Sequence, residues 1–334
     1  METKVTNFVG IDISKLSFDA AIISSGQTDN VAHRTFNKHT EFNAFLQWLE
    51  GFNVHLDSTT VVCMEFTGLY NASVLKDLLN EQAQVWMIMP MDIKRSGGLQ
   101  RGKSDKIDAQ RIALYALRHQ DKIRLYEPLN ETTEQLKQLL AQRERLVDSL
   151  TRLKVPIEEL KQEGLKELAK QLEQALKSAI KGLEKSIANT NIAIKETIAA
   201  NASIATQVER LISIPGIGPI TALSLIVYTD GFRRLLNAKK LACYCGVVPF
   251  EHSSGTSVRG KHRLSYMANQ KLKKLLHMAA LAAIKSDGEL QNYYLRKVNE
   301  GKNKMSVINA VRNKLVHRAV AVIREERLFI KRAA

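Results

Sequence analysis

Four acidic residues have the types and the spacing that metal-dependent chemistry on phosphate requires. Asp12 and Glu65 each follow an apolar run that predicts a buried strand, where an unpaired carboxylate is costly to bury. Asp105 and Asp108 are three residues apart, so they share one face of the helix that Ser104 is expected to cap. Each acid alone has an ordinary role, at a turn or in the first turn of a helix.

Taken together, two strand-borne and two helix-borne carboxylates predict a two-metal site, in which the cations lie about 3.5–4 Å apart. Oxygen-only donors favour Mg²⁺ or Mn²⁺. One competing motif overlaps this region, because residues 97–104 (Gly-Gly-Leu-Gln-Arg-Gly-Lys-Ser) match the P-loop pattern letter for letter. A P-loop follows a buried strand directly, whereas residues 90–96 intervene here. The acidic site is therefore the preferred interpretation.

A second segment offers candidate nucleophiles. Residues 247–263 contain four hydroxyl side chains and, after them, three cations: Ser253, Ser254, Thr256, Ser257, Arg259, Lys261 and Arg263. Nearby cations lower the pKa of a hydroxyl and neutralise phosphate oxygens, which favours attack on phosphorus. Chemistry alone does not choose among the four hydroxyls. The same residues would also suit a polar hairpin that only binds phosphate.

The net charge of +15 lies entirely at the end of the chain. Residues 206–334 contain 23 Lys and Arg against 8 Asp and Glu, whereas residues 1–126 contain 14 of each and residues 127–205 contain 12 of each. Such segregation is typical of a nucleic-acid-binding domain. The candidate phosphate contacts on its predicted helices are Lys271, Lys273, Lys274, Arg312, Lys314 and Arg318.

The basic segment opens with a Pro-Gly-Ile-Gly turn between two predicted helices, which is a helix-hairpin-helix signature. Gly216 and Gly218 would let backbone N–H groups approach a DNA phosphate, although a turn that only packs is the alternative. The rest of the segment is expected to be mainly helical. Its predicted helices are Asn237–Gly246, Ala268–Lys285, Leu290–Val298 and Met305–Arg327.

The first part of the chain alternates strands and helices. The predicted strands are Asn7–Ile13, Leu16–Ser24, Val31–Asn37, Thr59–Phe66 and Gln84–Met89, and the predicted helices are Glu41–Leu49, capped by Thr40, and Tyr70–Asn80. Three strands joined by short turns, followed by strands linked through helices, predict a mixed α/β sheet.

The middle of the chain has a helical pattern. Leucines and isoleucines recur at three- and four-residue steps from Leu136 to Ile198, which predicts a coiled coil within one chain or between chains. Pro156 and Gly164 are expected to mark a break or a turn. The chain is thus divided into a catalytic domain (1–126), a coiled-coil or oligomerisation segment (127–205) and a basic domain (206–334).

The sequence also predicts the compartment in which the protein is found. No apolar run approaches the ~20 residues of a membrane span, and the N-terminus lacks the apolar core of a signal peptide. Three cysteines are too few for a disulfide framework, and Cys243 and Cys245 are expected to be buried thiols rather than zinc ligands. A cytoplasmic protein without a membrane partner is expected.

The acidic motifs resemble those of a known family. Asp12 in Gly-Ile-Asp-Ile-Ser-Lys, Glu65 in Met-Glu-Phe-Thr-Gly-Leu-Tyr, and Asp105 and Asp108 in Lys-Ser-Asp-Lys-Ile-Asp-Ala are similar to the DEDD set of insertion-sequence transposases. That family is related to the Piv DNA invertase, and some members are bridge-RNA-guided recombinases. The later motifs match in order, so the resemblance covers nearly the whole chain. It implies a ribonuclease-H-like fold for residues 1–126, as in Holliday-junction resolvases.

The resemblance also implies a reaction and partners. The Ser-Gly pair of the family matches Ser254-Gly255, so Ser254 would attack a DNA phosphodiester and form a covalent phosphoserine while the four acids hold Mg²⁺ near that phosphate. The implied partners are donor and target duplex DNA, a structured guide RNA, and further copies of the chain in a homodimer or homotetramer whose subunits share the active site. Two alternatives are a metal-dependent nuclease or junction resolvase without a covalent intermediate, and a non-catalytic accessory protein that uses the P-loop match.

Overall fold

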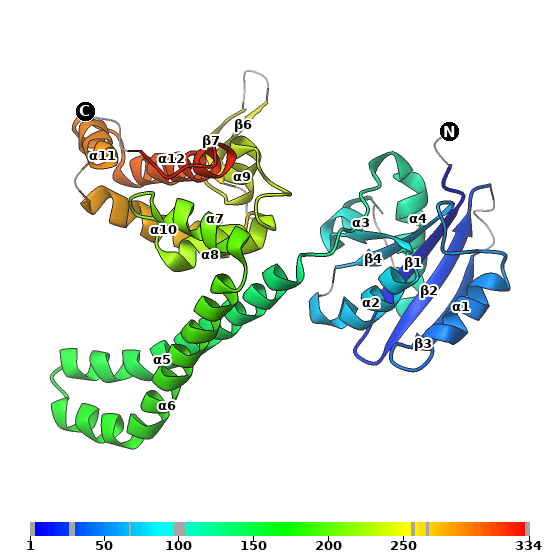
Figure 1. Ribbon diagram of the computed structural model, residues 1–334, viewed down its shortest axis with the longest axis horizontal. Helices are drawn as coiled ribbons and strands as arrows, with labels where there is room; N and C mark the ends of the chain where they lie inside the picture. The colour runs from blue at the N-terminus through cyan, green and yellow to red at the C-terminus, as the bar shows by residue number, and fades with distance from the viewer. Residues whose placement is uncertain are drawn as a thin grey trace. The chain divides into compact units, whose positions relative to one another are not determined.

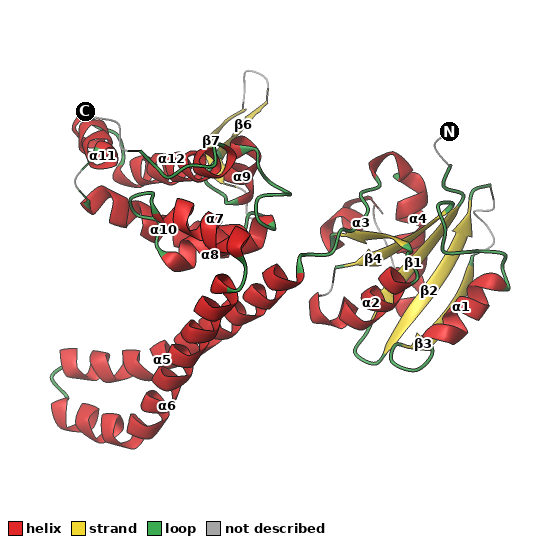
Figure 2. Ribbon diagram, in the orientation of Figure 1, coloured by secondary structure: helices red, strands yellow, loops and turns green. Residues whose placement is uncertain are grey.

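The protein divides into two compact units, residues 1–128 and 129–334 (Figure 1). The structure is a computed structural model, and it describes residues 4–26, 31–66, 68–96, 104–254, 258–264, 267–286 and 288–330. The first unit combines strands and helices, whereas the second is mainly helical (Figure 2). Each unit has its own hydrophobic core.

The first unit is built on a five-stranded mixed sheet. Its strands are β1 (Asn7–Ile13), β2 (Ser17–Ser24), β3 (Ala32–Asn37), β4 (Thr60–Glu65) and β5 (Gln84–Ile88), in the order β3-β2-β1-β4-β5. The first three strands form an antiparallel meander, and β4 and β5 run parallel to β1. This order and orientation are those of a ribonuclease-H-like sheet, as the resemblance implied. Each predicted strand is confirmed to within one residue at either end.

Helices cover both faces of this sheet. The helices α1 (Phe42–Glu50) and α2 (Ala72–Asn80) pack on one face, and α2 follows a 3₁₀ turn, η1 (Gly68–Asn71). The helix α4 (Asp105–Arg118) packs on the other face. Because the central strands are buried on both faces, their sequences are nearly continuous apolar runs.

Two local predictions need correction. Thr40 does not cap α1, because the N-cap residue is Glu41, whose carboxylate accepts a hydrogen bond from the Asn37 backbone N–H at 2.6 Å. Residues 90–96, for which no helix was predicted, form the short helix α3 (Pro90–Ser96). A helix therefore separates β5 from the Gly-rich run, which does not fit the strand-to-loop connection of a P-loop. Residues 97–103 of that run lie outside the described residues.

The second unit begins with a hairpin of two long helices, α5 (Glu131–Gln162) and α6 (Lys166–Ala199), which run antiparallel (Figure 1). Arg143 Nε donates to Asn191 Oδ1 at 2.8 Å, and Lys154 pairs with Glu184 at 2.7 Å. The break expected at Pro156 is absent, since α5 continues through this residue. The proline lies on an exposed side of the helix, where water can bond the carbonyl that its ring leaves without a partner.

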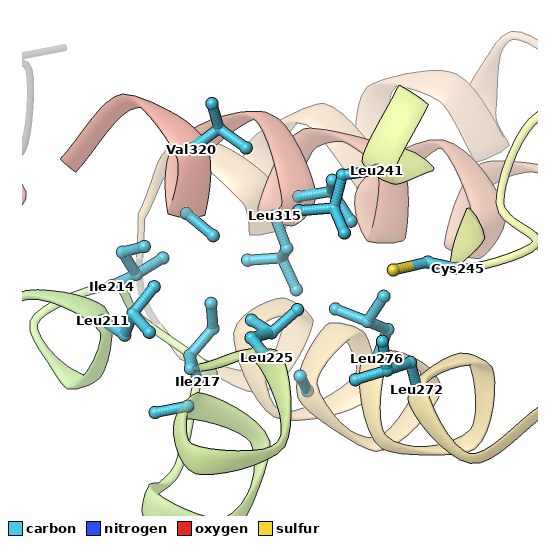
Figure 3. Close-up of a cluster of buried hydrophobic side chains, with 14 of the residues drawn as sticks. Leu211, Ile214, Ile217, Leu225, Leu241, Cys245, Leu272, Leu276, Leu315 and Val320 are labelled. Carbon is cyan, nitrogen blue, oxygen red and sulfur yellow. The ribbon is translucent and has the colours of Figure 1, made fainter. Parts of the chain in front are cut away.

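Further helices complete this unit: α7 (Ala202–Ile212), α8 (Pro219–Thr229), α9 (Ala238–Tyr244), α10 (Gln270–Lys285), α11 (Glu289–Asn299) and α12 (Lys304–Arg324). Between α9 and α10 stands a two-stranded hairpin, β6 (Pro249–Ser254) and β7 (Val258–Leu264). Leucine, isoleucine and valine side chains from α7, α8, α9, α10 and α12 meet in one core (Figure 3). Leu136 and Ile194 of the helical hairpin belong to the same core. The division of this part of the chain into an oligomerisation segment (127–205) and a basic domain (206–334) remains a prediction.

All three cysteines lie among the described residues. All three thiols are free, with Cys63 and Cys245 buried and Cys243 half-buried. Burial raises the pKa of Cys245 to about 12, which keeps this thiol protonated and unreactive at neutral pH. No helix in the described part of the chain is long and apolar enough to cross a bilayer.

Candidate active site

The register of the sheet places two of the acids side by side. In the parallel pair of β1 and β4, Ile11 is level with Met64. Asp12 and Glu65 are the next residues along, so they are level too. Side chains at level positions of neighbouring strands lie on the same face of the sheet. Asp12 and Glu65 therefore share the face that α4 covers.

A glycine brings α4 onto that face. Gly10 precedes Asp12 by two residues, so both lie on one side of β1. A Cβ atom at Gly10 would lie 2.3 Å from the Ala109 carbonyl oxygen and 2.3 Å from the Ala113 nitrogen of α4. No larger residue fits without displacing the helix. The absence of a side chain thus allows α4 to lie directly on β1.

The first turn of α4 carries the other two acids. The Oγ atom of Ser104 accepts a hydrogen bond from the Ile107 N–H at 3.3 Å, which confirms the predicted cap. Asp105 and Asp108 follow in this first turn. Asp108 pairs with Arg111 at 2.8 Å.

The four carboxylates interact through space. Burial, together with the negative charges of Asp108, Glu65, Asp105 and Asp19, raises the pKa of Asp12 from 3.8 to about 6. Such crowding of carboxylates, all with oxygen donors, suits a hard divalent cation. Within the described ranges, no three His, Cys, Asp or Glu side chains are close enough together to hold one ion. The acids therefore share one face and one electrostatic environment, but their side chains do not converge on a single point.

Asp19 is an acid near this site that the sequence analysis did not single out. It lies opposite Asp12 across the antiparallel pair of β1 and β2, and its side chain is 6% exposed. His33 Nε2 donates to Asp19 Oδ1 at 2.8 Å, and Thr35 Oγ1 donates to the same oxygen at 2.6 Å. The seven-residue spacing from Asp12, across a short turn between two predicted strands, was the available signal.

The candidate nucleophile belongs to the second unit. Ser254 is the last residue of β6 and pairs with Val258, the first residue of β7, so it stands next to the tip of the hairpin. Arg259 pairs with Ser253, and Lys261 and Arg263 follow on β7. Gly255, Thr256 and Ser257 lie outside the described residues.

The base of this hairpin is held at both ends. The Asn269 backbone N–H donates to the Tyr244 carbonyl at 2.8 Å, and Asn269 Nδ2 donates to the Tyr244 hydroxyl at 3.1 Å. On the first strand's side, Asn309 Nδ2 of α12 donates to the Val247 carbonyl at 2.8 Å. The segment that carries Ser254 is thus anchored to the helical core.

The two glycines of the helix-hairpin-helix turn differ in their surroundings. Gly216 has a positive φ of 92°, and a Cβ atom there would lie 2.4 Å from the Ala279 carbonyl of α10. This glycine serves close packing. Gly218 is the N-cap residue of α8, and among the described residues no atom lies within 4 Å of the position of its Cβ. Of the two glycines predicted to contact phosphate, only Gly218 has no described atom crowding its Cβ position.

One predicted phosphate contact, Arg312, is buried. Arg312 is 7% exposed, and its Nη2 bonds to His277 Nδ1 of α10 at 2.6 Å. Because α12 packs against α10 along this side, the guanidinium is buried rather than presented to DNA. Burial and the nearby charge of Arg312 lower the pKa of His277, which leaves its neutral form to accept this bond.

The other predicted phosphate contacts on α10 and α12 differ from one another in their surroundings. Lys271 pairs with Glu144, and Arg318 pairs with Glu289 at 2.7 Å. Lys314 lies 4.6 Å from the centre of the Tyr293 ring. Lys274 is exposed and Lys273 is half-buried on α10. The two ion-paired cations must exchange a carboxylate for a phosphate if they are to bind DNA.

Two family models match the chain one after the other. A transposase model named for the DEDD residues and for IS110 matches residues 9–163, and the model of the transposase IS116/IS110/IS902 family matches residues 208–295. The chain belongs to the IS110 family of transposases. The first match contains all four acids, and the second contains Ser254 and both turn glycines. The protein is therefore an enzyme of DNA transposition and recombination.

Similar proteins support this assignment. The pilin gene-inverting proteins of Moraxella lacunata and Moraxella bovis are each 29% identical to the transposase over 331 residues, which are 97% of this chain and 98% of theirs. The transposase for insertion sequence element IS1111A of Coxiella burnetii (strain RSA 493 / Nine Mile phase I) is 29% identical over 255 residues, 68% of each chain.

Among solved structures, Thermus thermophilus RuvC is similar to part of the chain. The match has a TM-score of 0.26 and 14% identity, and it covers 36% of this chain and 99% of that chain. The complex of the same protein with a Holliday junction substrate matches with a TM-score of 0.25 and 13% identity, over 34% of this chain and 96% of that chain.

Proposed function

We propose that this IS110-family transposase cuts and rejoins DNA through the joint action of the acidic face and Ser254. The supporting observation is the register that makes Asp12 level with Glu65, on the face where the first turn of α4 lies. The pKa of Asp12, raised to about 6 first by burial and then by the neighbouring carboxylates, supports their nearness to one another. Ordinary turn and cap roles for separate acids would not bring them to one face.

The proposed ion is Mg²⁺ or Mn²⁺, and the residues that would hold it are Asp12, Glu65, Asp105 and Asp108. Their donors are all carboxylate oxygens, which hard divalent cations prefer. When bound, the cation supplies Lewis acidity toward a phosphate oxygen and compensates the crowded negative charge. Glu65 and Asp12 come from rigid strands, so these two donors are fixed most firmly.

The proposed nucleophile is the Oγ atom of Ser254. Its bond to phosphorus forms as the bond between phosphorus and one sugar oxygen breaks, and the proton of the hydroxyl is passed to the solvent while the leaving oxygen takes one up. Attack on the phosphoserine by a sugar hydroxyl of another DNA end then rejoins the strand and frees the serine. The position beside a hairpin tip, next to a cationic strand, supports this role.

The proposed partners follow from the charge and from the family. The basic second unit would bind the donor and target duplexes, since the charge excess lies there. A structured guide RNA encoded by the element, and assembly into a homodimer or homotetramer, are implied by the resemblance to bridge-RNA-guided members. Sequencing the RNA that purifies with the protein tests the first of these, and light scattering tests the second.

A covalent adduct is the decisive measurement. The full-length protein is incubated with Mg²⁺ and a duplex that contains one end of its insertion sequence, and the products are separated on a denaturing gel. Wild type should form a protein–DNA adduct, whereas Ser254→Ala should bind the duplex and form none. The matched control is Ser257→Ala, which should keep the adduct.

Two outcomes would redirect the proposal. An adduct that persists in Ser254→Ala assigns the nucleophile to another hydroxyl. Cleavage by wild type without any adduct would favour a metal-dependent nuclease, in which the serine only binds phosphate. Asp12→Asn and Glu65→Gln should both abolish cleavage, and full cleavage by either variant would remove the acidic site.

A further inference from the structure

Lys38 is a buried cation near the end of β1 that carries Asp12. It follows the last residue of β3 and is only 6% exposed. Its ammonium lies 3.5 Å from the carbonyl oxygen of Ser14, which is the second residue after Asp12. Among the ion pairs of the described residues, none includes Lys38. A buried ammonium without a carboxylate is costly, so its presence here calls for a functional reason.

The ring of Tyr70 lies against this ammonium. Lys38 Nζ is 5.2 Å from the ring centre, which is a cation–π distance. Tyr70 itself is 49% exposed, so the ring touches Lys38 with one part and presents the rest to solvent. A large aromatic side chain held from beneath by a cation is pre-organised as a stacking surface.

Tyr70 is also fixed next to a candidate metal ligand. It belongs to η1, which directly follows β4 and its last residue, Glu65. Asn71 Nδ2 of the same turn donates to the Glu65 carbonyl at 2.6 Å. A group stacked on Tyr70 would therefore be close to the end of β4, where the acids lie.

We propose that Tyr70 and Lys38 form a subsite for one nucleotide of the DNA strand that reaches the acidic face. The base stacks on the exposed part of the Tyr70 ring, and the buried Lys38 ammonium holds that ring in place through the cation–π contact. The inference rests on the proposed function, because it takes DNA to be the molecule that lies across the acids. A nucleotide fits better than an apolar peptide, since the ring is backed by an uncompensated positive charge.

The test uses the full-length protein and a fluorescent base. A duplex with one end of the insertion sequence carries 2-aminopurine at each position in turn around the cut, in buffer with EDTA so that no cleavage occurs. Stacking on Tyr70 should quench the fluorescence at one position in wild type and in Tyr70→Phe. Tyr70→Leu should lose that quenching and bind the duplex about tenfold more weakly.

Matched variants separate this effect from general ones. Phe52 is 52% exposed but precedes β4 instead of following it, so Phe52→Leu should leave the quenching unchanged. Lys38→Met should weaken both the quenching and the binding, because the Tyr70 ring loses the cation that holds it, and Lys38→Arg should restore both. If Lys38→Met melts well below wild type, the Lys38→Arg and Tyr70 variants decide the question on their own.

The two proposals can fail independently. Two results would overturn the subsite even when Ser254 forms its adduct. One is that Tyr70→Leu quenches the fluorescence as wild type does at every position. The other is that wild type shows no quenching. Absence of the adduct overturns the serine mechanism, while position-specific quenching that depends on Tyr70 would still support the subsite.

Discussion

At the scale of single residues, Asp12 is where burial and charge crowding meet. Its pKa is raised to about 6 by burial and by the carboxylates around it. The folded protein therefore keeps the Asp12 proton to a higher pH than the unfolded chain, whose pKa is near 3.8. As the pH rises from about 4 through 6, the folded state loses this advantage, and above that range the ionised carboxylate destabilises it.

The variant Asp12→Asn should separate this electrostatic cost from catalysis. In metal-free buffer at pH 8, we expect it to be more stable than wild type by on the order of 1 kcal/mol, after allowance for solvent screening. The difference should disappear near pH 4. Urea denaturation with EDTA at both pH values measures it, and Asp121→Asn, an exposed acid outside the site, is the control. A less stable Asp12→Asn at pH 8 would argue against the crowding.

The residues of the site show what a single sequence can and cannot give. Asp12 and Glu65 were predictable because apolar runs define strands and a carboxylate within one is conspicuous. Asp19 was missed although its spacing from Asp12 was a signal, because its hydrogen bonds to His33 and Thr35 of a different strand could not be read from the sequence. The burial of Arg312 could not be predicted either, since the sequence of a basic helix does not show which side another helix will cover.

At the scale of elements, the placement of α4 brings the two helix-borne acids to the face of the sheet that carries Asp12 and Glu65. Gly10 sets it, because the carbonyl of Ala109 and the nitrogen of Ala113 occupy the space that a side chain would need. The helix then carries Asp105 and Asp108 toward the end of β1 at which Asp12 lies. The contact between β1 and α4 thus packs the first unit and, under the proposed function, also positions the acids.

Gly10→Ala should therefore reduce stability and catalysis together. Overpacking at this contact should cost about 1–3 kcal/mol, and the shift of α4 should slow strand cleavage at least about tenfold. Gly182 is the matched control, because it lies in α6 with no atom of the described residues within 4 Å of its Cβ position. Gly182→Ala should gain roughly 0.5–1 kcal/mol from helix propensity and leave cleavage unchanged. Denaturation and a cleavage time course give both numbers.

The hairpin that carries Ser254 is held at its base by side-chain hydrogen bonds. Removing the Asn309 side chain leaves the Val247 carbonyl without its donor and loosens the first end of the hairpin. Asn309→Ala should lower the yield of the covalent adduct while DNA binding stays within about twofold. Asn313→Ala serves as the control, because this neighbour on α12 has a buried side-chain oxygen with no partner among the described residues. An equal loss of adduct in both variants would point to α12 itself rather than to the hairpin.

Prediction of elements succeeded where apolar periodicity was strong. The five strands of the first unit agree within a residue because each is an apolar run between turn signals. For β6 and β7 the sequence suggested a polar hairpin but gave no strand bounds, since Pro249–Ser254 and Val258–Leu264 have no apolar alternation. Pro156 was expected to break α5, yet an exposed proline is tolerated where water can bond the freed carbonyl.

At the scale of the whole molecule, the positive charge and the acidic face belong to different units. Residues 129–334 contain 35 Lys and Arg against 19 Asp and Glu, whereas residues 1–128 contain 14 against 15. Several cations of the second unit are already paired, as Lys271 is with Glu144 and Arg318 with Glu289. The number of phosphates that the unit neutralises should therefore be well below its number of cations.

Separate expression of the two units tests this division, because each has its own core. The fragment 129–334 should bind a duplex with a steep salt dependence, with a slope of about −0.9 in log K against log salt for each phosphate neutralised. The fragment 1–128 should bind weakly at every salt concentration, since its net charge is close to zero. Fluorescence anisotropy with a labelled duplex between 50 and 200 mM salt, roughly the range over which such binding changes most, provides the slopes. Equal and salt-insensitive binding by the two fragments would show that DNA is not held by the charge excess, and the assignment of the second unit as the main DNA-binding part would then be wrong.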